Sequence, residues 1–442
     1  MAGTDVTSGP STSSGIRDTE DHFEPPPEPG FARREARYDK KPRKRDPSGR
    51  LLKPRPTEPA RKEGAHGGTR GFPVTVETVG SKLEFGRLAG SWDELVRAMP
   101  RPSPFLLHAW LVEWWRHYGG EAELAVQVAY RGDRLVGALP ICIQRRHGLR
   151  VSEFLGGAGA ALADVLVAPG EDGATVARLV ERGASARHDF ANLFGLPGSS
   201  RLVAALPPGA LRLVERLEAP VLDLSAGWDA VYAAKTTSKL RGDRRRRMRQ
   251  LEALGTVEMA IARTPDELER ALEDAFHVHA LRWQGRRDAS DFATPTGMRF
   301  YRAAVLRLAE DDAARILTLR LDGRAIAFAL SLQLSGRAYG VTMAFDPAFA
   351  RFGPGTEALL RRLETAAGEG MTRFELLGAA AFHKRKFTDR FEPIYQGIGL
   401  ARTLRGRAAV AALVGGIRFR RRLKRLKTAQ KIYYRVPRLM RR

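Results

Sequence analysis

The residues best suited to binding chemistry lie in segment 345–356, which reads Phe-Asp-Pro-Ala-Phe-Ala-Arg-Phe-Gly-Pro-Gly-Thr. Its glycines let the backbone come close to a ligand. If a helix begins here, the free N–H groups near Gly353, Gly355 and Thr356 attract an anion, with help from the helix dipole. Arg351 adds a charged donor for a phosphate. The segment therefore predicts a phosphate site, and a plain tight turn is the alternative.

Three elements must position this loop. Residues 315–334 predict a hairpin, because two β-rich runs flank Asp322-Gly323, which is a strong two-residue turn signal. After the loop, residues 357–367 have helical spacing of their apolar side chains, and residues 372–377 read as a strand. The predicted order is hairpin, strand, glycine loop, helix and strand.

This order, with Arg-x-Gly-x-Gly in the loop, resembles the acyl-CoA-binding core of the GNAT acetyltransferase superfamily. A narrower likeness is to the CelD-type acetyltransferase domain, which is named for bacterial cellulose biosynthesis and is related to the FemAB-type peptidyl transferases. The residues that carry it are Trp283, Phe300-Tyr301, Phe345-Asp346-Pro347, Pro354-Gly355 and Phe374-Glu375-Leu376-Leu377-Gly378, followed by Lys384. The likeness covers residues 235–395 well and residues 72–230 loosely.

The resemblance implies an acyl-CoA as co-substrate, most simply acetyl-CoA. Its pyrophosphate would contact the N–H groups near Gly353, Gly355 and Thr356, and Arg351 would add a charge-assisted contact. Lys384 would contact a phosphate or a carboxylate of the acceptor. For Lys384 the alternative is an ordinary basic helix face.

The resemblance also indicates a general base. Glu375 lies on the strand after the binding helix, where the family usually has an acidic residue, and it would take a proton from the acceptor. A solvated carboxylate, or a partner for Arg373, is the alternative. Three alanines follow Gly378, where the family often has further acidic residues. His383 is therefore a second candidate for the base.

Two tyrosines are candidates for the general acid. Tyr339 and Tyr301 would donate a proton to the departing CoA thiolate, as tyrosine does in many GNAT enzymes, and half-buried packing is the alternative. The sequence contains no zinc pattern, because Cys142 is its single cysteine. We expect no metal, and direct transfer in a ternary complex without a covalent enzyme intermediate.

The composition and the family resemblance together predict four segments. They are a disordered tail at 1–70, an N-terminal GNAT-like domain at 71–230, a C-terminal acyl-CoA-binding domain at 231–400 and a basic amphipathic tail at 401–442. The predicted fold class is α/β, with two GNAT-like mixed-sheet halves in tandem. The similarity of the hairpins at 128–138 and 319–328 indicates this duplication. Any two amphipathic hairpins look alike, however, and chance similarity is the alternative.

The positive charge of the chain is concentrated in two places. The net charge is +24, and residues 401–442 contain fifteen Arg or Lys and no Asp or Glu. A second cluster lies at 235–249. Such surfaces attract phosphates, nucleic acid, anionic lipid or acidic polymers. The run 241–249 would line a channel for an anionic glycan or a lipid-linked sugar, or bind RNA, and a solvated helix face is the alternative.

The C-terminal tail has an amphipathic pattern. Phe419, Leu423, Leu426 and Tyr433 share one stripe of an otherwise cationic helix, which suits an anionic membrane surface. Packing of this stripe on the protein's own core is the alternative. The longest apolar run in the tail is far shorter than the ~20 residues of a membrane span. No signal peptide opens the sequence, and we expect a cytoplasmic protein, peripheral at the inner membrane face.

The function that these patterns predict is an acyl-CoA-dependent N-acyltransferase. It would move an acetyl group to an amine or hydroxyl of a small-molecule or glycan acceptor. An amino sugar of a polysaccharide precursor is the acceptor that the family analogy favours. The alternatives are an aminoacyl-tRNA-dependent FemAB-like transferase, and a non-catalytic basic module that binds nucleic acid or membrane.

Overall fold

The computed structural model describes residues 72–157, 161–171, 173–185, 188–284, 290–378 and 387–425. The predicted disordered tail at 1–70 lies outside the described residues, as do His383 and Lys384. Residues Gly67–Arg442 form one compact unit.

The first half of this unit contains nine strands and several short helices among its described residues. In chain order they are β1 Val74–Val79, α1 Lys82–Gly86, α2 Ala89–Arg97, η1 Pro104–Leu106, α3 His108–Tyr118, β2 Glu123–Leu124, β3 Val126–Arg131, β4 Arg134–Leu139, β5 Ile141–Arg146, β6 Leu149–Phe154, β7 Leu166–Val167, α4 Gly173–Ser185, β8 Phe190–Pro197, α5 Arg201–Ala205 and β9 Leu211–Asp223.

The second half has longer helices. Its elements are α6 Trp228–Lys235, α7 Ser238–Glu252, β10 Val257–Ala262, α8 Pro265–Trp283, η3 Asp291–Ala293, α9 Pro295–Ala309, β11 Ala314–Leu321, β12 Arg324–Leu334, β13 Arg337–Phe345, η4 Pro347–Phe352, α10 Pro354–Gly368, β14 Arg373–Glu375, β15 Arg390–Gly399 and α12 Leu404–Arg425.

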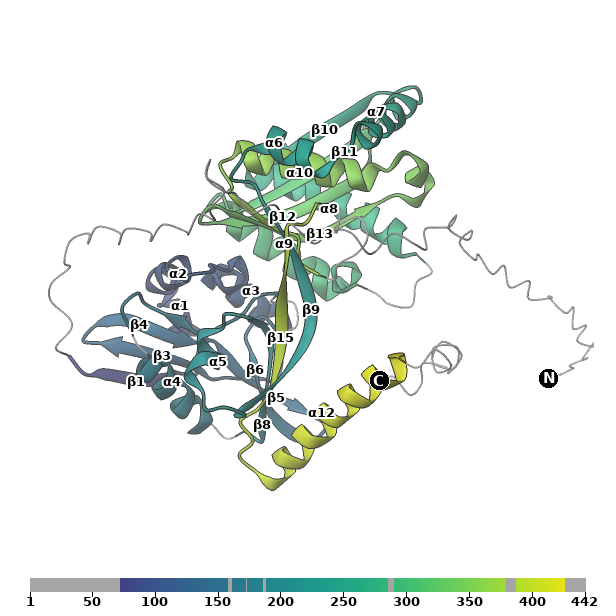
Figure 1. The fold of residues 1–442 in the computed structure, drawn as a ribbon. Helices are drawn as coiled ribbons and strands as arrows, with labels where there is room; N and C mark the ends of the chain where they lie inside the picture. Colours follow the sequence, from purple (N-terminus) through teal and green to yellow (C-terminus); the bar gives the residue numbers. More distant parts are fainter. Residues whose placement is uncertain are drawn as a thin grey trace, which may run out of the picture. The chain divides into compact units, whose positions relative to one another are not determined.

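In the described residues the strands form two sheets (Figure 1). The smaller has the order β1-β3-β4-β7, and the larger has the order β10-β11-β12-β13-β14-β9-β15-β8-β6-β5-β2. The chain passes from the first sheet to the second at Pro140, between the end of β4 and the start of β5. Proline has no N–H to give to a ladder, so it suits a point where pairing changes partner.

Strands β9 and β15 run side by side and join the two halves (Figure 1). Their antiparallel ladder extends from the pair Arg390↔Val221 to the pair Gly399↔Leu211. β15 also pairs with β8 of the first half, and β9 pairs with β14 of the second half. One hydrogen-bonded sheet therefore runs through both halves. The fold is α/β, with a mixed parallel and antiparallel sheet that both halves share.

The structure confirms the hairpin predicted at Asp322-Gly323. The two residues join β11 to β12 and have φ of 48° and 77°. Positive φ at both central positions is the geometry that suits the right-handed twist of a two-residue hairpin. The first half also has a two-residue hairpin, between β3 and β4, in which Gly132 has φ of 60° but Asp133 is not left-handed. Both segments that look alike in the sequence are therefore hairpins, with different turns.

Helix α8 begins with side-chain caps that short-range chemistry favours. Thr264 accepts a hydrogen bond from the N–H of Glu267, and the Glu267 side chain accepts one from the N–H of Thr264. This reciprocal pair is a capping box, and Pro265 fills the first helical position, which needs no N–H. Because α8 packs against β12 and β13, these caps determine where the helix that covers this part of the sheet begins.

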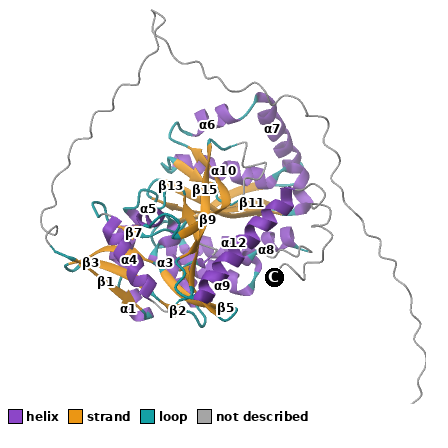
Figure 2. Ribbon diagram, turned by 60° about the horizontal axis from the view of Figure 1, so that its bottom comes forward, coloured by secondary structure: helices purple, strands orange, loops and turns teal. Residues whose placement is uncertain are grey.

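Helix α12 (Figure 2) contacts β8 and β15. Val414 is buried, and Val410 and Ile417 pack beside it on a small core cluster of the sheet. Phe419, which belongs to the predicted stripe, is 63% exposed. The other members of that stripe lie where side chains are not described. No helix in the described part of the chain is long and apolar enough to cross a membrane.

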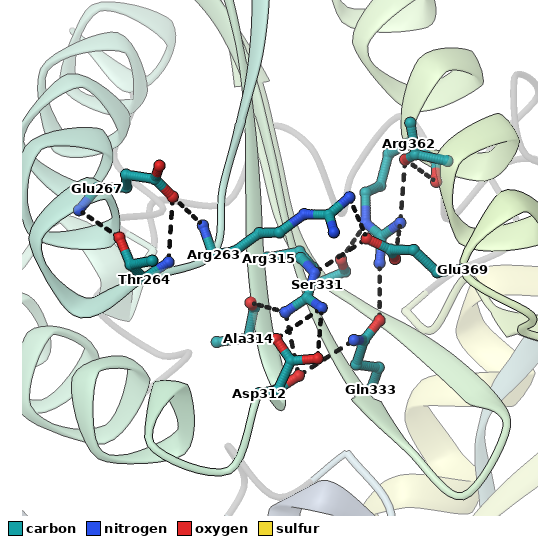
Figure 3. Close-up of polar contacts among 11 residues, drawn as sticks. Arg263, Thr264, Glu267, Asp312, Ala314, Arg315, Ser331, Gln333, Arg362 and Glu369 are labelled. Atoms are coloured by element: carbon teal, nitrogen blue, oxygen red, sulfur yellow. Dashed lines mark hydrogen bonds and ion pairs between the residues drawn. The ribbon is translucent and has the colours of Figure 1, made fainter.

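A buried polar cluster fastens α10 to the sheet (Figure 3). Arg362 is fully buried, and its Nε donates to Ser331 Oγ of β12 at 2.7 Å. Glu369, at the end of α10, lies 3.2 Å from Arg362 Nη1 and 3.0 Å from both Arg315 Nε and Arg263 Nη2. Burial lowers the pKa of Arg362 to about 10. One carboxylate thus balances three guanidinium groups.

This arrangement predicts a large stability loss for Glu369→Gln. The substitution leaves the buried Arg362 guanidinium without its counter-charge, while Arg315 keeps its ion pair with Asp312. The free energy of unfolding should fall by about 3 kcal/mol in chemical denaturation. Glu364→Gln on the same helix is the control, because Glu364 pairs only with Arg361 and is 38% exposed. It should cost less than about 0.5 kcal/mol. Equal losses in the two variants would show that Glu369 is not the electrostatic anchor of α10.

Candidate active site

Strands β13 and β14 are parallel and pair only at their starts. The ladder joins residues 337–339 to residues 373–375. Beyond it, the N–H of Leu376 bonds to Pro220 O of β9, while β13 continues to Phe345. The second half of β13 therefore has one edge without a strand partner among the described residues. Such an edge offers N–H and C=O groups to an extended ligand.

Helix α10 begins at the end of this unpaired edge. Gly353 precedes it in the left-handed region, with φ of 71°. The N–H of Gly353 bonds to Ala350 O at 3.1 Å, and the N–H of Thr356 bonds to Gly353 O at 3.0 Å. The N–H of Gly355 has no hydrogen-bond partner in the described residues. Of the three predicted anion donors, only Gly355 thus keeps a free N–H.

Gly355 is required for packing. A Cβ at this position would lie 2.7 Å from Cδ1 of Phe345, a distance that real contacts do not reach. The first turn of α10 can therefore rest on the Phe345 ring only because residue 355 is glycine. A larger side chain here would disturb the fold as well as any ligand, so this position cannot test ligand binding alone.

A cavity of about 130 Å³ opens at the start of α10. Gly353 and Thr356 line one side of it, and Lys235, Arg244 and Arg247 from α6 and α7 line the other. The predicted basic run at 235–249 therefore meets the predicted glycine loop. This places three cationic side chains around a helix N-terminus, which already favours anions.

Two of these cations have partners, and the third does not. Arg244 donates to both carboxylate oxygens of Glu357, at 2.6 Å and 2.5 Å, and this hydrogen bonding raises the pKa of Arg244. Lys235 contacts the Asp389 carboxylate. Arg247 forms no ion pair or hydrogen bond with another described residue, and its Nη1 lies 3.4 Å from the position of a Cβ on Gly353. Arg247 is therefore the cation available to a ligand.

Arg351 occupies a different place from the predicted one. Its guanidinium lies over the Phe352 ring, 4.6 Å from the centroid, and its side chain is exposed and does not line the cavity. The neighbouring Asp346 is buried and caps η4 through Ala348, while Arg324 pairs with it at 2.7 Å. The Asp-Pro pair thus fixes the loop, and Arg247 lies where Arg351 was expected.

Glu375 is fully buried and surrounded by arginines. Its Oε2 lies 2.7 Å from Arg101 of the first half, and its Oε1 lies 2.7 Å from Arg373 and 3.6 Å from Arg337. Arg101 and Arg373 also contact Glu392 of β15. The pairing with Arg373, one alternative from the sequence, is therefore observed, and both carboxylate oxygens are engaged.

The two predicted tyrosines lie apart. Tyr339 is fully buried beside Glu375, and its hydroxyl donates to Pro102 O of the first half. Burial, and then the charge of Glu375, raise the pKa of Tyr339. Tyr301 lies on α9 against a separate cavity, and burial raises its pKa to about 12. Both tyrosines keep their protons at neutral pH, and Tyr339 already donates to a carbonyl.

One histidine, His279, lies in the core of the second half. It is buried on α8, next to Phe292 and Trp283, and its Nδ1 has no hydrogen-bond partner among the described residues. Burial lowers its pKa to about 4, so the imidazole is neutral at physiological pH. In the described part of the chain, no three His, Cys, Asp or Glu side chains gather closely enough to hold a metal ion.

The corresponding helix of the first half, α4, has its own carboxylate at its start. Glu171 accepts hydrogen bonds from Arg131 at 3.0 Å and 2.8 Å and from Thr175 at 3.0 Å. The bonds from Arg131 lower the pKa of Glu171, which is therefore ionised at neutral pH. A carboxylate that is paired with an arginine therefore lies at the start of α4, as Glu357 paired with Arg244 does in the first turn of α10.

The structure thus brings Gly353, Gly355 and Thr356 together at one site, and it holds Glu375 and Tyr339 together at another. Arg247 and Arg101 were missed as individual residues. Arg244 and Arg247 are three residues apart, and this spacing predicts that they share one face of a helix. The sequence could therefore have indicated that they act together. The sequence could not show which element that face meets.

Residues 238–385 match the profile of the acetyltransferase (GNAT) domain family. The match runs from α7, which carries Arg247, through β13 and α10 to the residues after β14. These residues form a GNAT-type acetyltransferase domain. The GNAT domain is an acyltransferase domain, which fits the phosphate-sized cavity at the start of α10. No curated protein sequence matches the chain.

Solved structures resemble the chain at low identity. FemX has a TM-score of 0.50 at 11% identity, over 72% of this chain and 96% of that one. The C-terminal domain of a putative lysylphosphatidylglycerol synthetase from Agrobacterium fabrum gives 0.48 at 15%, over 75% and 96%. A tandem GNAT protein from the clavulanic acid biosynthesis pathway gives 0.43 at 14%, over 75% and 100%. The likeness to FemX concerns the fold alone.

The ion-pair cluster predicts that Glu375→Gln destabilises the protein strongly. A neutral side chain of the same shape leaves buried guanidiniums without a counter-charge, and the free energy of unfolding should fall by roughly 3 to 5 kcal/mol. Glu392→Gln should cost less, because Glu392 is 24% exposed. Chemical denaturation of both variants checks this order. A Glu375→Gln variant as stable as the parent would show that the cluster does not hold the halves together.

Proposed function

We propose that the second half is an acyl-CoA-dependent acyltransferase that transfers an acyl group, most simply acetyl, to an amine or hydroxyl acceptor. The observation that carries this proposal is the cavity at the start of α10 in the GNAT domain, where Arg247, which has no partner among the described residues, lies beside Gly353 and Thr356. A pyrophosphate there would supply negative charge to Arg247 and to the helix N-terminus. The unpaired edge of β13 would hold the amide-bearing arm of CoA in an extended form.

The transfer itself needs no enzyme nucleophile. The acceptor nitrogen or oxygen attacks the thioester carbonyl carbon, a C–N or C–O bond forms, and the C–S bond breaks. The acceptor's proton passes to a base, and the CoA thiolate takes up a proton to leave as the thiol. What the protein must supply is position, because near-attack geometry accounts for much of the rate of such reactions.

The base role of Glu375 remains a proposal, and its surroundings weigh against it. A general base needs a free lone pair within reach of the acceptor, whereas both oxygens of Glu375 already contact arginines. Tyr339 would have to leave Pro102 O before it could protonate a thiolate. His383 and Lys384 also remain proposals, because they lie outside the described residues. A water molecule that carries the acceptor's proton is consistent with this arrangement.

A second candidate function is aminoacyl transfer from tRNA. The exposed side chains of α7 include Arg245, Arg246 and Arg249, which would suit a polyanion larger than CoA. The narrower CelD-type assignment, with an amino sugar of a polysaccharide precursor as acceptor, also belongs to this proposal and rests on family analogy. Calorimetry with acetyl-CoA, CoA and tRNA side by side separates the two donors.

The cavity at α10 predicts a specific loss of CoA affinity for Arg247→Ala. Removing the one unpaired cation beside the helix start should weaken binding of CoA about tenfold, because a charge-assisted hydrogen bond contributes about 1.5 kcal/mol. Arg245→Ala is the matched control, since it removes the same charge from the same helix outside the cavity. Isothermal titration measures the affinity of both variants for CoA and, as a comparison without phosphate, for pantetheine. Equal affinities for CoA in the two variants would contradict the proposed site.

We also infer that α12 attaches the protein to an anionic membrane surface. Phe419 is 63% exposed and Leu404 is 81% exposed, on a helix that has many arginines and no acid. Each basic residue near such a surface contributes about 1 kcal/mol. The double substitution Phe419→Ser with Arg422→Glu should therefore reduce sedimentation with anionic vesicles at least about tenfold. Arg246→Glu on α7 is the control, and equal binding of all three proteins would refute the attachment.

A further inference from the structure

Two cavities border strands β5, β6 and β8 and meet at three polar side chains. The first, of about 530 Å³, lies against α3 and α9. The second, of about 540 Å³, lies against α12. Arg146, Glu153 and Asn192 line both cavities. Together the cavities form one trough whose two ends differ in chemistry.

The end against α3 and α9 combines aromatic walls with hydrogen-bonding groups. Trp114 and Tyr118 stack with their ring centroids 6.1 Å apart, and the Tyr118 hydroxyl donates to Asp291 Oδ2 at 2.6 Å. Gln144 and Tyr301 line the same cavity. A sugar ring has apolar C–H faces and a polar rim, so it can contact both kinds of wall. Few polar groups among aromatic side chains are typical of sites that orient a small ligand.

The end against α12 is apolar because the helix presents small residues to it. Ala409, Ala412 and Gly416 of α12 line this cavity opposite Val151 and Phe190 of the sheet. Small side chains leave open space between the helix and the strands, and the walls on both sides are hydrocarbon. An alkyl chain in this space would remove apolar surface from water, which is favourable in proportion to the area covered.

The junction between the two ends carries positive charge. Arg420 and His147 line the α12 end, and Arg146 lines both ends. Glu153 is the acidic side chain at this junction, and it lies 3.2 Å from Arg146. A phosphate at the junction would meet two guanidiniums and an imidazole.

We propose that this trough binds the acceptor, an amphiphile in which a phosphate joins an apolar chain to a sugar. The chain lies under α12, the phosphate lies at Arg146 and Arg420, and the sugar lies between α3 and α9. The sugar end is next to the catalytic half, because α9 packs on α8 and α8 packs on β13. This assignment rests on the proposed acyltransferase function. It also moves the lipid-linked acceptor away from residues 241–249, where the sequence placed it as one alternative.

Three soluble probes test the trough in calorimetric titrations of the full chain. They are decyl phosphate, glucosamine 1-phosphate and the decyl diester of glucosamine 1-phosphate. The diester, which contains all three parts, should bind about 30-fold tighter than either smaller probe. The entropy of fixing a ligand in the site is lost only once, while both ends of the diester gain contacts. A diester of decyl phosphate with glycerol serves as the competing headgroup. If it binds as tightly as the sugar diester, the sugar assignment is wrong.

Adjacent glycines of α12 provide a matched pair of variants. Gly416 lines the trough, whereas Gly415 lines a different cavity beside β9, and a Cβ on either meets nothing within 4 Å. Gly416→Leu should fill the apolar end and weaken the decyl probes about tenfold, without changing the affinity for glucosamine 1-phosphate. Gly415→Leu should leave all three affinities unchanged. Both remove a helix-interior glycine, so thermal melting should show neither to be destabilised.

The outcomes distinguish this inference from the function on which it rests. Acetyl-CoA binding is measured in the parent and in both glycine variants. If acetyl-CoA binds but the sugar diester binds no better than glucosamine 1-phosphate, or if the two glycine variants lose equal affinity, the trough inference is overturned alone. If acetyl-CoA fails to bind the parent, the acyltransferase proposal fails, and the probe affinities still report whether the trough takes an amphiphile.

Discussion

The pairing of β9 with β15 is the constraint on which the rest of the molecule depends. Each strand belongs in sequence to one half and forms hydrogen bonds with a strand of the other, since β9 pairs with β14 and β15 pairs with β8. A change of register in this ladder would move β14, whose pairing with β13 is only three residues long. The point at which β13 and β14 diverge is therefore set by contacts made outside the GNAT-type domain itself.

Several buried or half-buried carboxylates of the second half hold arginines in place, in a chain whose net charge is +24. Glu375 contacts three guanidiniums, Glu369 contacts three more, and Glu357 holds Arg244 with both oxygens. Burial makes these interactions strong, and it also makes the loss of one partner expensive. These carboxylates thus determine which basic side chains are held in ion pairs and are not available to a ligand. Arg247 remains available to a ligand because the only nearby buried acid, Glu357, is already taken by Arg244.

Local patterns in the sequence were sufficient for much of the fold. The Asp322-Gly323 turn, the capping box at Thr264 and the helix after Gly353 follow from short-range chemistry, and the structure shows each of them. The individual donors at the site could not be predicted from such local patterns, because their positions depend on contacts between distant segments. Arg101 reaches Glu375 across 274 residues, and the run at 235–249 meets α10 only in the folded chain. Periodicity shows which residues share a face, and it leaves open what that face meets.

The same reasoning explains the apolar stripe of α12. Its spacing correctly indicated an amphipathic helix, but the sheet takes the face with Val410, Val414 and Ile417, and Phe419 stays exposed. Two neighbouring stripes of similar hydrophobicity cannot be ranked from the helix alone, because the ranking depends on the shape of the strand surface beneath.

The direct transfer that we propose requires the two halves of the protein to keep a fixed orientation to each other. The acceptor and the thioester must come within roughly 3 to 3.5 Å in a fixed orientation. Halves joined by a flexible linker would lose that orientation, and a hinge between them would have to break the ladder of β9 with β14 and the contacts of Arg101. Arg101 also comes from the same proline-rich turn whose Pro102 carbonyl accepts the bond from Tyr339. These contacts hold the first half in a fixed orientation to the second half. For the acyl transfer that we propose, we therefore expect substrates to enter by local movement of loops and side chains, because opening the halves would change the geometry that direct transfer requires.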